Sequence, residues 1–115
     1  MGVADSKYID LVSGLPRVAN NETLYKKLVA KFEASIDIAA IDSALAAKDF
    51  SKVGELVHAA KGVAGNLSLT AFFESSVVLM DQLRGGGEPL QENVAAFKKL
   101  YAETVSAINE YLADY

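Results

Sequence analysis

Apolar residues recur at alternating three- and four-residue steps along most of this chain. The longest series runs without a break from residue 90 to residue 112. Its members are Leu90, Val94, Phe97, Tyr101, Val105, Ile108 and Leu112. Because an α-helix turns once in about 3.6 residues, this spacing places one apolar stripe along one face of a helix. No stretch shows a convincing two-residue alternation typical of a half-buried strand, so the sequence predicts an all-α fold.

Capping residues and helix breakers divide the chain into one short helix and four long ones. The pair Asn20-Asn21, Asp49 and Ser68 supply good N-caps, because their side-chain oxygens can accept hydrogen bonds from the first turn. Gly14 and Pro16 should end the short N-terminal helix, since proline disfavours helical geometry in the residue before it. We predict helices over residues ~5–14, ~21–47, ~49–67, ~69–84 and ~89–113.

The segment from residue 21 to residue 47 contains no glycine or proline, but its apolar pattern changes phase. A first stripe includes Leu24, Leu28 and Phe32, and the change falls near residues 35–38. We expect one long helix, bent at this point, or two nearly continuous helices. Tyr25 lies on the flank of the first stripe and is expected to pack in the core or at its rim.

Short connections between long helices favour antiparallel neighbours. The expected architecture is therefore an up-down four-helix bundle with the short N-terminal helix covering one end. With 115 residues, of which 51% are hydrophobic and 23% charged, the chain should form a single domain over residues 1–115 with a modest core.

Composition argues against several classes of function. The chain has no cysteine, which excludes disulfides and thiolate metal sites. A net charge of −4 without a lysine- or arginine-rich block argues against nucleic acid as the main partner. No apolar run approaches the roughly 20 residues of a membrane span, and the N-terminus does not resemble a signal peptide. We expect a cytoplasmic protein with no membrane segment.

The only histidine, His58, lies on the predicted helix over residues 49–67. The apolar stripe of this helix consists of Phe50, Val53, Val57, Ala60, Ala64 and Leu67. A second face carries His58, Lys61, Gly62 and Gly65, at i, i+3, i+4 and i+7. At about 100° per residue this second face lies roughly 130° from the centre of the stripe. We therefore expect the histidine on the flank or the outside of the helix.

Glycine inside a helix costs about 1 kcal/mol relative to alanine, so the glycines of this helix need a reason. Gly62 and Gly65 leave bare backbone beside an exposed imidazole, which gives a large partner room to approach the ring. The other explanation is that Gly54, Gly62 and Gly65 only allow close packing between helices. The residues alone do not decide between these two explanations.

Residues 58–67, His-Ala-Ala-Lys-Gly-Val-Ala-Gly-Asn-Leu, resemble the signature of the histidine-containing phosphotransfer (HPt) domain. Residues 14–17, 24–32 and 44–50 resemble its entry segment, its first long helix and the turn before the histidine helix. The resemblance covers almost the whole chain. Two positions depart from it: Ser68-Leu69 replaces a usual Gly-Ala, and Leu79-Met80 replaces a frequent leucine–glutamate pair.

The resemblance implies that His58 carries a phosphoryl group and exchanges it with an aspartate of a response-regulator receiver domain. Lys61 would offset charge on the phosphoryl oxygens, and Gly62 and Gly65 would give the partner access. The catalytic Mg²⁺ would belong to the receiver, so the chain itself needs no cofactor or metal. A hybrid histidine kinase is the other implied partner, and the chain is expected to be a free-standing monomer without kinase motifs. Exposed imidazole is largely unprotonated near neutral pH and can act as a nucleophile.

Two other classes of function remain open. The chain could be an HPt-like interaction module that docks on a receiver or a kinase without accepting phosphate. It could also be an enzyme that uses His58 as a general base, although Glu55 is the only carboxylate close to it in the sequence. Metal binding is the weakest reading, because there is one histidine and no thiol.

Overall fold

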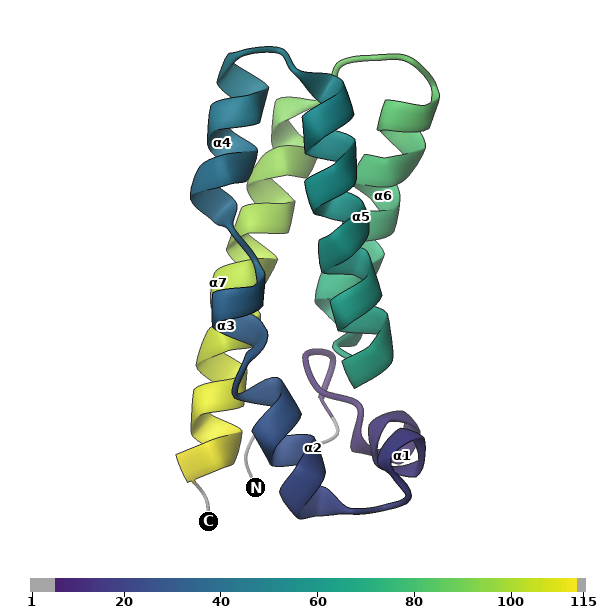
Figure 1. Cartoon of the computed structure of the whole chain (residues 1–115), viewed down its shortest axis with the longest axis vertical. Coiled ribbons are helices and arrows are strands. Elements are labelled where there is room, and N and C mark those ends of the chain that lie inside the picture. The colour runs from purple at the N-terminus through teal and green to yellow at the C-terminus, as the bar shows by residue number, and fades with distance from the viewer. Residues whose placement is uncertain (1–5, 114–115) are drawn as a thin grey trace.

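The computed structural model describes residues 6–113, which form an all-α bundle and contain no strand. Its main helices are α4 (Ile38–Ala46), α5 (Phe50–Leu67), α6 (Thr70–Arg84) and α7 (Gln91–Ala113). Successive helices run in opposite directions along the long axis of the molecule (Figure 1). The predicted all-α bundle is confirmed.

The segment predicted as one long helix over residues 21–47 is divided into three. It forms α2 (Glu22–Val29), α3 (Phe32–Ser35) and α4, so the prediction of one long helix was wrong, and the alternative of two nearly continuous helices missed the break after Val29. Ile36 adopts an extended conformation between α3 and α4. The Asp37 carboxylate accepts a hydrogen bond from the Ala40 amide at 2.9 Å and thereby caps a new helix. This break lies where the apolar pattern changes phase.

The N-terminal region also differs from the predicted helix over residues 5–14, of which residue 5 lies outside the described residues. The helix α1 covers only Leu11–Gly14, and a 3₁₀ helix, η1, follows it over Leu15–Val18. The helix α1 ends at Gly14, as predicted, but the chain then continues into η1, where Pro16 lies in the first turn and its missing amide proton costs nothing. We call residues 6–18 the N-terminal strap. It crosses the end of the bundle where α5 meets α6 (Figure 1).

The core lies along the predicted stripes, with one shift in α7. On α5, the predicted stripe is buried except for Phe50, which is half-buried. Leu90, which precedes α7, is 53% exposed, whereas Thr104, Ala107 and Tyr111 on α7 are buried in addition to Phe97 and Ile108. The buried face of the second half of α7 is therefore rotated by about one residue from the predicted stripe. The sequence did not reveal this rotation, because Thr104 and Tyr111 carry polar atoms and were not part of the predicted apolar stripe.

The turn between α5 and α6 corrects the role predicted for Ser68. Ser68 is the residue after α5, in the left-handed conformation with φ of 56°, and the Leu69 amide donates to the Ala64 carbonyl at 2.9 Å. It does not cap α6, whose preceding residue is Leu69. A carbonyl of the strap instead accepts a hydrogen bond from the first turn of α6, since the Ala71 amide donates to the carbonyl of Lys7 at 2.8 Å.

Candidate functional site

The exposed face of α5 carries the candidate site. The helix begins after Asp49, whose carboxylate accepts a hydrogen bond from the Lys52 amide at 3.1 Å, as predicted. Burial of the apolar stripe fixes the rotation of α5 about its axis, so the opposite face points to solvent. The exposed residues along this face include Glu55, His58, Ala59, Gly62 and Asn66. The structure thus places His58 outside the core.

The His58 imidazole is not engaged by another described side chain. The ion pairs of 4.0 Å or less within residues 6–113 are Arg84–Asp81 and Lys98–Asp42, and neither involves the histidine. The Glu55 carboxylate is therefore not paired with the imidazole as it would be in a general-base dyad. The ring is exposed to solvent.

The glycines of α5 are in different surroundings. A Cβ atom added at Gly62 would meet nothing within 4 Å, so close helix packing does not explain this glycine. A Cβ atom at Gly65 would lie 3.1 Å from the ring of Phe73 on α6, so packing gives a sufficient reason for glycine there. Gly54 also borders open space, and nothing in the structure explains it. Open space beside the imidazole is therefore found at Gly62, one turn beyond His58.

Lys61 lies one turn from His58 on the half-buried flank of α5. No carboxylate of the described chain lies within ion-pairing distance of its ammonium group. Its positive charge is therefore not neutralised by an ion pair within the described residues.

Hydrogen bonds from residues outside α5 hold its C-terminal end in place. The buried Tyr25 hydroxyl donates to the Leu67 carbonyl at 2.5 Å. The Asp10 amide donates to the Ser68 carbonyl at 3.0 Å, and the Ser13 and Ser68 hydroxyls lie 2.9 Å apart. Burial raises the pKa of Tyr25, and the negative charge of Asp10 raises it further. These contacts fix the end of the histidine helix.

The sequence predicted a buried Tyr25 and did not reveal its hydrogen bond to Leu67. The two residues are 42 positions apart, and helical periodicity carries no information about such a pair. The strap contacts to Ser68 were missed for the same reason. The one available signal was the Ser68-Leu69 departure from the family pattern, which marked this turn as unusual.

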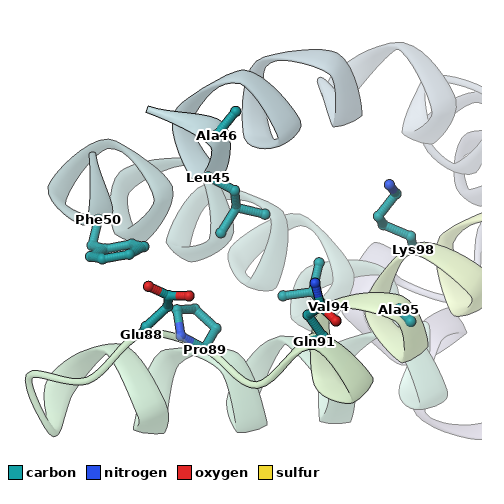
Figure 2. A pocket seen from close by; sticks show the side chains of 9 residues that line it. All are labelled: Leu45, Ala46, Phe50, Glu88, Pro89, Gln91, Val94, Ala95 and Lys98. Atoms are coloured by element: carbon teal, nitrogen blue, oxygen red, sulfur yellow. The ribbon is translucent and has the colours of Figure 1, made fainter. Parts of the chain in front are cut away.

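A separate cavity of about 650 Å³ lies at the opposite end of the bundle. Figure 2 shows Leu45 and Phe50 facing Pro89 and Val94 across it. It is formed where the α4–α5 turn meets the loop before α7, at the N-terminal end of α5. Within residues 6–113, no three histidine, cysteine or acidic side chains come together as a metal-binding group. Over the same residues, no helix is both long and apolar enough to cross a membrane.

Comparison with models of known protein families shows to which family the chain is related. The model of the Hpt domain matches residues 29–112, which is well over half of the sequence. The chain belongs to the Hpt domain family. No curated protein and no solved structure matched it.

Membership of the Hpt family indicates the process in which this chain takes part. Hpt domains are phosphotransfer modules of two-component phosphorelays, and they act as phosphocarriers rather than as classical enzymes. Their partners are two-component proteins such as receiver domains and kinases. The matched region includes α5 with His58 and excludes the whole N-terminal strap and all of α2 except Val29.

Proposed function

We propose that His58 accepts a phosphoryl group and relays it to or from the aspartate of a response-regulator receiver domain. The observation that carries this proposal is the exposed, unpaired imidazole on α5, with open space at Gly62 one turn away. It is the only histidine of a chain that belongs to a phosphotransfer family.

The proposed step is an in-line displacement at phosphorus. A ring nitrogen of His58 attacks the aspartyl phosphate of the receiver with its lone pair. The P–N bond forms while the P–O bond to aspartate breaks, and the aspartate leaves as a carboxylate. The reverse reaction returns the group to aspartate. Such transfer depends mainly on positioning and charge stabilisation, which explains why one histidine and one lysine suffice on this side.

The Lys61 ammonium group would offset negative charge on the phosphoryl oxygens as the group passes between the partners. The Mg²⁺ required by the reaction would be held by the receiver. Open backbone at Gly62 would let the active site of the receiver close over the imidazole, whereas Gly65 is explained by the Phe73 ring that a Cβ atom there would meet.

A transfer assay tests the proposal. Wild-type chain and His58→Gln are each incubated with a panel of receiver domains phosphorylated with radiolabelled phosphate. We expect label on the wild type alone, stable in base and labile in acid, as a phosphohistidine is. If neither chain takes up label while binding to a receiver is retained, the chain is an interaction module instead.

A further inference from the structure

A groove of about 600 Å³ runs beside the C-terminal half of α5. Its apolar walls come from η1, α2 and α5 and consist of Val18, Leu28, Val63 and Leu67. Asn66, which also lines the groove, lies on the exposed face of α5 that carries His58 and Gly62. The groove is therefore continuous with the candidate site.

The charged residues that line the groove are both cations, Arg17 from the strap and Lys31 from the turn between α2 and α3. Neither has an ion-pair partner within residues 6–113. The chain as a whole carries a net charge of −4, so this pair of free cations is a local departure from the overall charge. The groove thus combines an apolar interior with a cationic edge, which complements an apolar side chain flanked by carboxylates.

The separation from His58 indicates what these cations can do. Asn66 lies eight residues beyond His58, which corresponds to about 12 Å along the helix axis. A phosphoryl group on the imidazole is therefore out of reach of Arg17 and Lys31. A protein partner that covers His58 with a footprint of about 800 Å² does reach this distance.

We propose that this groove is the second half of the receiver-docking surface and takes an acidic, apolar-centred segment of the receiver. The inference rests on the proposed function, because the occupant is the same partner that meets His58. It goes beyond membership of the family, since Arg17 and the strap lie outside the residues that the family model matches. Arg17 and Lys31 act on affinity and partner choice and not on the transfer step.

The test uses the full chain, a receiver domain that exchanges phosphate with it, and phosphoramidate as a small phosphate donor. Arg17→Glu/Lys31→Glu is compared with Arg84→Glu/Lys99→Glu, which changes the net charge equally at exposed positions away from the groove. We expect the first variant to raise the Kd for the receiver by at least about fivefold, more at low salt than at high salt. The control variant should stay within about twofold of wild type.

Phosphoramidate separates the two proposals, because this donor transfers its phosphoryl group to histidine, releases ammonia and needs no docking surface. Both variants should be phosphorylated on His58 at the wild-type rate. Equal Kd values for the two variants, with His58 still phosphorylated, would overturn the docking inference and leave the proposed function standing. Failure of the wild type to accept phosphate from either donor would remove the function, and the inference with it.

Discussion

In the proposed reaction the His58 imidazole is the nucleophile, and its neighbours act on charge and on access. Lys61 and Gly62 follow it at i+3 and i+4, so both lie within one turn of the ring. The fold does not depend on either residue, since Lys61 has no ion-pair partner in the described chain and Gly62 borders open space. Substitutions here should therefore alter transfer without unfolding the protein.

Lys61→Ala removes the positive charge nearest to the phosphoryl oxygens. We expect slower transfer from the receiver, by about 10-fold to 100-fold, or a shorter phosphohistidine lifetime, because charge in the transition state loses a stabilising partner. Rapid-quench transfer and the decay of labelled chain measure the two effects, and Lys61→Arg should retain most of the activity. If the transfer rate and the phosphohistidine lifetime are unchanged in Lys61→Ala, then Lys61 is an ordinary solvated charge without a role in transfer.

Gly62→Phe adds a bulky ring one turn beyond the imidazole. We expect transfer from a receiver to fall by at least about 10-fold, because the ring occupies the space through which the partner approaches. Circular dichroism should show an intact fold, and phosphorylation by phosphoramidate should proceed. Ala102→Phe, at an exposed small residue of α7, is the matched control and should transfer normally. Normal transfer by Gly62→Phe would refute the access argument.

Thr104 carries a buried hydroxyl with no hydrogen-bond partner among the described residues. Thr104→Val keeps the shape and removes the unsatisfied group, so we expect the free energy of unfolding to rise by about 1 kcal/mol. Urea denaturation measures the change. Ser76→Ala is the comparison, because the Ser76 hydroxyl donates to the Phe72 carbonyl at 2.9 Å and its removal should bring no such gain. A less stable Thr104→Val would show that the hydroxyl is satisfied in solution.

At the scale of the elements, α5 is positioned by its buried stripe along its length and by Tyr25 and the strap at its end. Periodicity and caps predicted α5 well, since Asp49 and the stripe are local features. Neither break in residues 21–47 is marked by Gly or Pro; the one before α4 lies at the change of phase, where Asp37 caps α4, and the one after Val29 was not predicted. The role of Ser68 was also mispredicted, since contacts from the strap determine that turn.

Tyr25→Phe tests how α5 is held. The variant leaves the buried Leu67 carbonyl without its donor, so we expect a loss of about 1–3 kcal/mol in the free energy of unfolding at neutral pH. Burial raises the pKa of Tyr25, so above about pH 10 the unfolded chain releases a proton that the folded chain keeps. Wild-type stability should therefore fall above about pH 10, and this fall should be smaller in Tyr25→Phe.

Denaturation at several pH values between neutrality and about pH 11 gives both quantities. Tyr8→Phe is the control, since the Tyr8 hydroxyl bonds the Glu103 carboxylate on a half-buried surface and its removal should leave the alkaline loss of stability in place. Identical pH profiles for wild type and Tyr25→Phe would show that the phenol does not anchor the helix.

At the scale of the whole molecule, the bundle is an elongated body of 42 × 22 × 19 Å with its candidate site on the flank of α5. The helix α5 and the exposure of its histidine could be predicted from spacing and caps, because they depend on one helix. The groove with Arg17 and Lys31 could not, since it joins residues from η1, the α2–α3 turn and α5. The exposed face of α5 could therefore be predicted from the sequence, whereas the groove beside it could not.

The central claim is that His58 is the phosphoacceptor, and ³¹P NMR of the phosphorylated chain tests it most directly. Wild type and His58→Gln are phosphorylated from a receiver domain and their spectra are recorded under native conditions. We predict a single phosphohistidine resonance in the wild type and none in His58→Gln. A phosphoryl resonance that persists in His58→Gln, or one in the wild type from serine, threonine or aspartate, would contradict the account.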